Sequence, residues 1–135
     1  MSDENLEIVR RLHQHLETGE LWAIEEALDP DVEWHWPADP AAGAEAGVDH
    51  QPADVVATAL HRLSCWERFW IEPRDFVEAD DDVIVSVSHR ARMKGSDEEI
   101  HEELAYVWSL KDGKVTRFRT FADRSAALAA ARTSD

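Results

Sequence analysis

The chain has 135 residues, 44% hydrophobic and 32% charged, which indicates one globular domain over residues 1–135 and excludes a disordered chain. Its 14 basic and 29 acidic residues give a net charge of −15, which excludes nucleic acid and membrane surfaces as partners because their phosphates would be repelled. The single cysteine, Cys65, excludes an intramolecular disulfide and favours a reducing, cytoplasmic location. The N-terminus has no signal-peptide pattern, and no apolar run approaches the ~20 residues of a membrane span.

Two helices and one strand are predicted in the first third of the chain. Residues 3–17 repeat apolar side chains at helical spacing, and residues 20–28 repeat the same spacing over a shorter helix. Residues 31–37 alternate instead, which predicts a strand. The apolar face of this strand carries Val32, Trp34 and Trp36.

The rest of the chain is predicted to contain one more long helix and then a sheet. Residues 38–51 have no period and are interpreted as a loop, and Pro52 then opens a helix at its first position. The expected later elements are strands over 68–77, 83–94, 104–110 and 115–123, and a helix over 125–132. The order α-α-β-α-β-β-β-β-α predicts an α+β fold, with helices on one face of a curved antiparallel sheet.

The strongest local signal is a β-hairpin near the end of the chain. Asp112-Gly113 separates two runs that are rich in β-branched and aromatic residues, as is typical of a tight hairpin turn. The second run ends at Asp123, and helix-forming residues follow at once. The sequence therefore places a carboxylate where the last strand stops and the last helix starts.

The first hairpin strand is apolar on both faces. Tyr106 and Trp108 lie on one face, and Ala105 and Val107 lie on the other. Helices on one side of the sheet leave the second face exposed, and soluble monomers seldom expose a large apolar patch. One interpretation is a homodimer through the outer sheet face, with Tyr106 and Trp108 at the interface. The alternative is that the Tyr106 and Trp108 face is the core and the smaller face is exposed.

Four segments resemble the SnoaL-like group of the nuclear transport factor 2 and ketosteroid isomerase superfamily, over roughly residues 5–131. They are Gly19-Glu-Leu-Trp-Ala, Leu28-Asp-Pro-Asp-Val-Glu-Trp, the run 104–115 and the run 117–128. The resemblance implies a cone, in which a strongly bent sheet wraps around the N-terminal helices and holds a mostly apolar pocket. Members include isomerases, polyketide cyclases, epoxide hydrolases, dehydratases and non-catalytic modules, so the activity must be argued from the site.

The resemblance also implies which polar positions matter. Three polar groups of the ketosteroid isomerases fall near Leu12, at Trp36 and near Ala105, and all three are apolar here. Isomerisation by that route is not expected, because an enolate needs a base and a hydrogen-bond donor. Polyketide cyclases of the SnoaL type carry an acid/base aspartate at the end of the last strand, and Asp123 matches that position.

Asp123 is the leading catalytic candidate, and His89 is the weaker one. If Asp123 faces the pocket, desolvation raises its pKa and suits it to acid/base work, whereas the alternative is a cap of the last helix. His89 shares a strand face with several valines, as either a pocket residue that pairs with Asp123 or a core histidine. Arg119 is either near Asp123 or a solvated strand residue, depending on the facing of that strand.

A pocket with aromatic walls and few titratable groups favours a small hydrophobic molecule. The residues expected to bind it are Trp36, Ala105, Val107, Phe118 and Arg119. No cofactor is expected because no glycine-rich phosphate loop is present, and no metal is expected because the histidines lack ligand spacing. The leading hypothesis is an acid/base enzyme of cyclase, isomerase or hydrolase type that uses Asp123. The alternative is a non-catalytic ligand-binding or assembly module.

Overall fold

The fold is a cone formed by a curved sheet and the helices on its two sides. The structure is a computed structural model, and it describes residues 2–39 and 43–133. The elements are α1 (Ser2–Thr18), α2 (Leu21–Ala27), β1 (Leu28–Trp36), β2 (Gly47–Asp49), α3 (Pro52–Leu63), β3 (Trp66–Ala79), β4 (Asp82–Met93), β5 (Glu99–Lys111), β6 (Lys114–Phe121) and α4 (Arg124–Thr133). The predicted α+β class is confirmed, and every predicted helix and strand is present.

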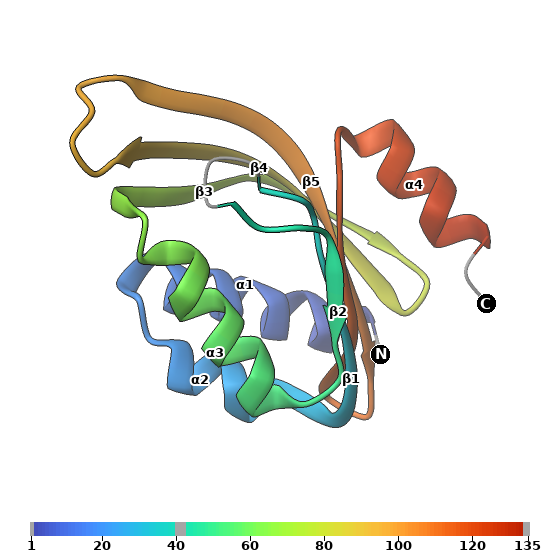
Figure 1. The fold of residues 1–135 in the computed structure, drawn as a ribbon. Helices are drawn as coiled ribbons and strands as arrows, with labels where there is room; N and C mark the ends of the chain where they lie inside the picture. The colour runs from blue at the N-terminus through green and yellow to red at the C-terminus, as the bar shows by residue number, and fades with distance from the viewer. Residues whose placement is uncertain (1, 40–42, 134–135) are drawn as a thin grey trace.

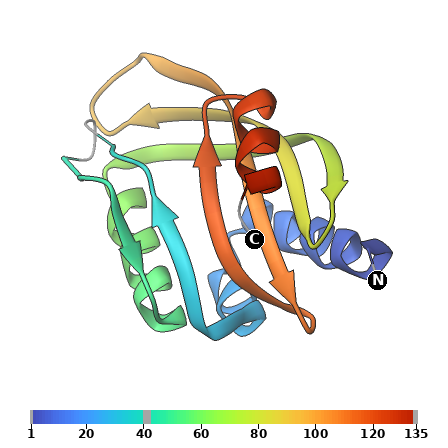
Figure 2. The same ribbon diagram turned by 90° about the vertical axis from the view of Figure 1, so that its right-hand side faces the viewer.

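The six strands form one sheet in the order β2-β1-β6-β5-β4-β3. All neighbouring strands are antiparallel except β1 and β6, whose arrows point the same way in Figure 2. The short strand β2 lies inside the segment that the sequence interpreted as a loop, and it pairs with the end of β1. Strands β3, β4 and β5 arch over α1, α2 and α3, while α4 lies on the other side of the sheet (Figure 1).

Local sequence explains where these elements begin and end. Helix α1 buries Val9 and Leu12, and the chain leaves it at Gly19, where φ is 75° and a side chain would be strained. Helix α3 starts with Pro52 in its first turn, where the missing N–H costs nothing. The turn between β5 and β6 has positive φ at Asp112 and Gly113, as the Asp-Gly pair predicts for a tight hairpin.

The concave face of the sheet holds the main core. Tyr106 and Trp108 are 5% and 0% exposed, and they pack with Val9 and Leu12 of α1 and with Phe118 of β6. The dimer interpretation required these two residues to lie on the outer face, and they do not. The alternative interpretation of this strand, in which their face is the core, describes the structure correctly.

The outer face of β5 carries a second, smaller core. Ala105 and Val107 are buried there against Ala127 of α4, together with Ile84 of β4. The sequence prediction that helices cover one face only is thus incomplete, because α4 covers part of the other face. Both apolar faces of β5 are thus covered within one chain, the Tyr106 and Trp108 face by the concave core and the Ala105 and Val107 face by α4.

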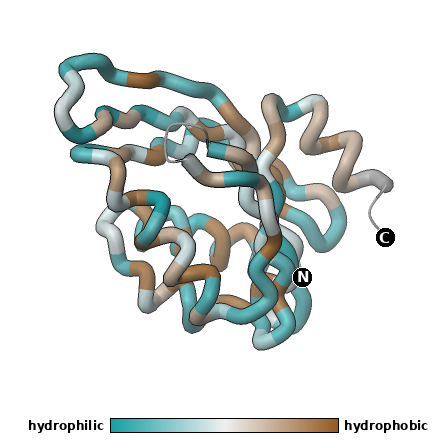
Figure 3. Tube along the Cα trace, viewed as in Figure 1, coloured by the Kyte–Doolittle hydropathy of each residue, from teal (hydrophilic) through white to brown (hydrophobic). Residues whose placement is uncertain are grey.

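Beyond α4, the outer sheet surface is polar. Figure 3 shows mostly hydrophilic residues along the far end of β4 and β5, and apolar residues recurring along α1 to α3. Among the residues that the structure describes, no helix is long and apolar enough to cross a membrane.

Candidate functional site

A cavity of about 500 Å³ lies between the concave face of the sheet and helices α1, α2 and α3. Its size is in the range of pockets that bind drug-sized molecules. Aliphatic side chains from α2, α3 and the sheet line much of its wall. The aromatic residues that line it are Trp34, Trp36, Trp66, Phe69, Tyr106, Trp108 and Phe118.

His89 and Tyr106 form the polar centre of this cavity. Tyr106 is on β5, His89 is on the neighbouring strand β4, and the histidine Nε2 and the tyrosine hydroxyl form a short hydrogen bond. Burial lowers the pKa of His89 to about 4, although the Glu103 carboxylate acts in the opposite direction. Burial also raises the pKa of Tyr106 far above its usual value, and the Glu102 carboxylate adds to this effect. Both side chains are therefore neutral near pH 7.

A neutral pair of this kind can serve a ligand in two ways. If the Tyr106 hydroxyl donates to His89 Nε2, the tyrosine oxygen is free to accept a hydrogen bond from a ligand. If His89 Nε2–H donates to the tyrosine oxygen, the hydroxyl proton is free to be donated to a ligand oxygen. The pair can thus recognise one hydroxyl or carbonyl group on an apolar molecule.

A second histidine, His13, packs against the ring of Tyr106. It is 2% exposed on α1, and its ring stacks on the Tyr106 ring at a centroid distance of 5.9 Å. Trp108 Nε1–H donates to His13 Nε2 at 3.2 Å, which places the proton of the neutral ring on Nδ1. Burial, followed by the nearby His89, lowers the pKa of His13 to about 4.

The Trp36 wall of the cavity is held by a carboxylate outside it. Trp36 Nε1–H donates to Asp49 Oδ2 at 2.8 Å, and the Thr58 hydroxyl of α3 donates to the same oxygen at 2.6 Å. The strand β2 therefore has a clear role, because it carries Asp49 and pairs with β1 beside Trp36. This arrangement fixes the indole ring against rotation.

Arg62 of α3 packs over the ring of Trp36. Its guanidinium carbon is 5.0 Å from the centroid of the Trp36 ring, at the distance of a cation–π contact. Nη1 donates to the Pro37 carbonyl oxygen at 2.7 Å, and Nη2 donates to the Glu45 carbonyl oxygen at 2.9 Å. Arg62 thus ties α3 to the chain that follows β1, and it also lines the cavity.

The structure places Asp123 away from this cavity. Asp123 is exposed at the start of α4, and its Oδ1 accepts a hydrogen bond from the backbone N–H of Ala126 at 2.9 Å. This is the geometry of a helix cap, the alternative that the sequence left open. Asp123 is not among the residues that line the cavity, so it is not brought together with His89.

The other predicted site residues divide by the face of the sheet that they occupy. Trp36, Phe118 and His89 line the cavity. Ala105 and Val107 lie on the opposite face under α4, so they do not. Arg119 pairs across the sheet with Val107 and lies 3.9 Å from the Asp82 carboxylate, which also places it outside the cavity. The dimer interpretation had turned Ala105 and Val107 towards the pocket, whereas the facing of the strand that carries Arg119 had been left open.

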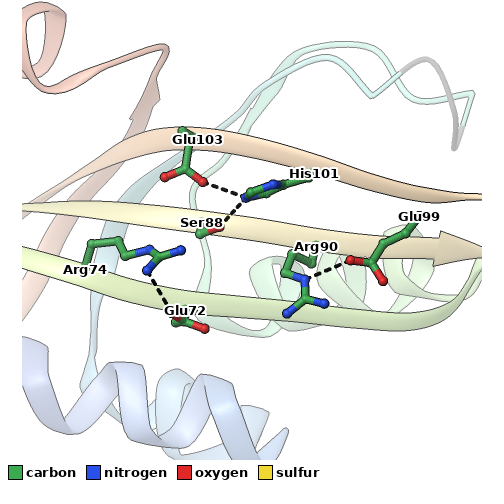
Figure 4. A network of polar contacts seen from close by, with 7 residues as sticks. All are labelled: Glu72, Arg74, Ser88, Arg90, Glu99, His101 and Glu103. Atoms are coloured by element: carbon green, nitrogen blue, oxygen red, sulfur yellow. Dashed lines mark hydrogen bonds and ion pairs between the residues drawn. The ribbon is translucent and has the colours of Figure 1, made fainter.

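A polar network on the outer sheet face has the composition of a catalytic triad without its geometry (Figure 4). His101 Nε2 contacts both Ser88 Oγ at 2.7 Å and Glu103 Oε2 at 2.8 Å. A triad needs a different ring nitrogen for each partner, so this set cannot relay a proton from the serine to the carboxylate. Ser88 is also 1% exposed. Nearby ion pairs, such as Arg90 with Glu99 at 2.8 Å, are exposed and contribute little to stability.

Two functional candidates were missed by sequence reasoning. Tyr106 was assigned to a dimer surface and His13 was not singled out, yet both lie in or beside the cavity. The strand alternation could have found Tyr106, because it places Tyr106, Trp108 and Leu104 on one face. Within residues 2–39 and 43–133, no group of three or more His, Cys, Asp or Glu side chains is arranged to hold a metal ion.

Comparison with known proteins agrees with this architecture. The model of the SnoaL-like domain matches residues 9–118, so the chain belongs to the SnoaL-like domain family. A search of curated proteins finds no match.

Solved structures share the fold over nearly the whole chain. An NTF2-like protein of unknown function from Burkholderia pseudomallei is 21% identical, with a TM-score of 0.78 over 93% of this chain and 95% of that chain. TerC, co-crystallised with polyporic acid, is 22% identical, with a TM-score of 0.76 over 96% and 99%. A putative SnoaL-like polyketide cyclase from Jannaschia sp. is 17% identical, with a TM-score of 0.75 over 99% and 94%. At these identities the likeness establishes the fold, and the chemistry rests on the residues of this chain.

Proposed function

We propose that this protein binds a small, mostly apolar molecule in the cone, and that the Tyr106–His89 pair recognises one oxygen group on it. The observation that carries the proposal is a hydrogen-bonded polar pair, neutral near pH 7, in a cavity with otherwise largely apolar and aromatic walls. The crystallisation of TerC with polyporic acid is consistent with a small-molecule site in a related cone. The apolar walls supply affinity, and the polar pair supplies orientation.

The test compares two probes that differ by one oxygen, 2-acetylnaphthalene and 2-ethylnaphthalene. One neutral hydrogen bond contributes about 0.5–1.5 kcal/mol, so the ketone should bind the wild-type protein about two- to twelve-fold more tightly. The variant Tyr106→Phe should bind the two probes equally, because it loses the hydroxyl and keeps the ring. Quenching of tryptophan fluorescence measures both affinities.

The control variant is Asp123→Asn, which changes a carboxylate that lies outside the cavity. It should retain the preference for the ketone. Failure of both probes to bind wild-type protein would refute a small-molecule cavity of this kind. Equal binding of both probes to wild-type protein would refute recognition by Tyr106.

A second candidate function is acid–base catalysis on the bound molecule, and the contact between Tyr106 and His89 favours it. A tyrosine hydroxyl that receives a hydrogen bond from His89 can donate to a carbonyl oxygen as negative charge develops on it. The proton leaving the neighbouring carbon would pass to water. Exchange of the methyl protons of 2-acetylnaphthalene in D₂O, followed by NMR, tests this function. Wild-type protein should accelerate the exchange, and Tyr106→Phe should not.

The homodimer expected from the sequence stays a prediction, but the exposed apolar patch from which it was inferred does not exist among the residues that the structure describes. Tyr106 and Trp108 are buried in the core of one chain, so any dimer must use other residues. A reducing, cytoplasmic setting is likewise proposed from the single cysteine, Cys65.

A further inference from the structure

Three charged residues line the cavity, namely Arg62, Asp39 and Glu102. Arg62 lies on α3 beside the end of β1, whereas Glu102 lies on β5 as the direct cross-strand neighbour of His89. After burial, the nearby Glu102 carboxylate also raises the pKa of Tyr106, and Asp39 lies two residues after Pro37, whose carbonyl oxygen accepts a hydrogen bond from Arg62. Arg62 and the polar pair therefore lie on different elements of the cavity wall, the first on α3 and the second on β4 and β5.

The positive charge of Arg62 is not neutralised within the described part of the chain. Its two hydrogen-bond acceptors are the backbone carbonyl oxygens of Pro37 and Glu45, and no carboxylate within residues 2–39 and 43–133 forms an ion pair with it. Arg62 Nε is buried and has no hydrogen-bond partner among the same residues. This is unusual in a chain with 29 acidic residues, because a partly buried charge is costly unless it is paired.

The guanidinium is also held in place before any ligand arrives. Trp36 packs against its face at 5.0 Å, and Asp49 fixes the Trp36 ring through a hydrogen bond of 2.8 Å. A planar guanidinium with free N–H groups matches a carboxylate in geometry, and little side-chain freedom is left to lose on binding.

We propose that Arg62 forms an acid-recognition subsite, and that the ligand of this cavity is an apolar molecule with a carboxylate or similar acidic group at one end. The acidic end lies against Arg62 and Trp36, and an oxygen group further along the molecule reaches Tyr106 and His89. This inference rests on the proposed function, because it specifies the ligand class of the same cavity. It assigns the orientation of the ligand to two contacts, one with Arg62 on α3 and one with the polar pair on β4 and β5.

The test uses three probes with the same ring system, 2-naphthoate, 2-naphthamide and (2-naphthyl)methylammonium. Wild-type protein at pH 7 and low salt should bind the naphthoate about ten-fold more tightly than the neutral amide, as expected for charge-assisted hydrogen bonds. The ammonium probe should bind most weakly. Added salt should reduce the advantage of the naphthoate in wild-type protein, which is a second readout that needs no variant.

Arg62→Gln should remove the advantage of the naphthoate and leave the affinity for the amide within about two-fold. The matched control is Arg90→Gln, which removes the same charge from the outer sheet face, where Arg90 bonds to Glu99. It should retain the wild-type preference. Arg62→Lys keeps the charge without the planar fork and should retain part of the preference.

Three outcomes would overturn the inference while leaving a small-molecule cavity in place. The naphthoate could bind no more tightly than the amide, the ammonium probe could bind most tightly, or Arg62→Gln could weaken naphthoate and amide equally. The last result would show that Arg62 only ties α3 to the chain after β1. Absence of binding by all three probes would refute the proposed function, and this inference with it.

Discussion

The burial of His13 predicts a specific loss of stability in mild acid. His13 is 2% exposed, and its pKa falls from 6.5 to about 4 in the folded protein because burial disfavours the charged ring. Between these two values the unfolded chain binds a proton that the folded chain does not. The free energy of unfolding therefore decreases as the pH falls from 6.5 towards 4.

The size of the effect follows from the two pKa values. A shift from 6.5 to about 4 corresponds to about 3 kcal/mol once the pH is below the lower value. Near pH 5, about 2 kcal/mol of stability should already be lost through His13 alone. That is a large share of the stability of an ordinary small domain.

The variant His13→Gln isolates this effect from the titration of the acidic residues. Its side-chain carbonyl can accept the hydrogen bond that Trp108 Nε1–H donates to His13 Nε2, and it does not titrate. Denaturant unfolding, followed by tryptophan fluorescence near pH 7 and near pH 5, gives the free energy of unfolding for both proteins. The wild type should lose about 2 kcal/mol more than the variant between the two conditions.

The comparison uses the change with pH, so a constant offset between the proteins does not affect it. Equal losses in wild type and His13→Gln would refute the argument, because they would mean that His13 carries no buried, depressed pKa. An NMR titration of the His13 ring supplies an independent check. The ring should stay neutral well below pH 6.5 in the folded protein.

Three further predictions concern other parts of the chain. Asp123→Ala should lower the free energy of unfolding by about 1 kcal/mol through loss of the α4 cap, and thermal denaturation should show Asp123→Asn to be milder. Asp49→Leu should release the Trp36 indole, shift its fluorescence and weaken naphthoate binding several-fold, whereas Asp49→Asn should retain most of the affinity because its side-chain oxygen still accepts a hydrogen bond. Light scattering at micromolar concentration tests the homodimer prediction, and the mass of a single chain would contradict it.

Much of the fold could be predicted because its signals are local. The helical spacing of residues 3–17 and the Asp112-Gly113 turn both depend on neighbours along the chain, and the structure has both features. The parallel pairing of β1 with β6 joins segments far apart in the sequence, and no local pattern specifies it. Strand β2 has only three residues, too few for a periodic signal.

The site was harder to predict because it depends on which way each strand faces. Phe118 was expected to line the pocket and does so, His89 lines it as one of the two alternatives left open, and Ala105 and Val107 were expected in the pocket but lie on the other side of β5. Since side chains alternate, a wrong choice of face reverses every residue of the strand. The choice depended on α4, whose docking over Ala105 and Val107 could not be seen from its own alanine-rich sequence.

The alternation of β5 also separates two tasks that an engineer could change independently. Tyr106 and Trp108 line the cavity. Ala105 and Val107, which alternate with them along the strand, pack against α4. A mutant library confined to the cavity-facing positions would vary ligand preference and leave the docking of the last helix untouched. The same strand could therefore acquire a new ligand specificity by few substitutions, without changes in the packing of the rest of the fold.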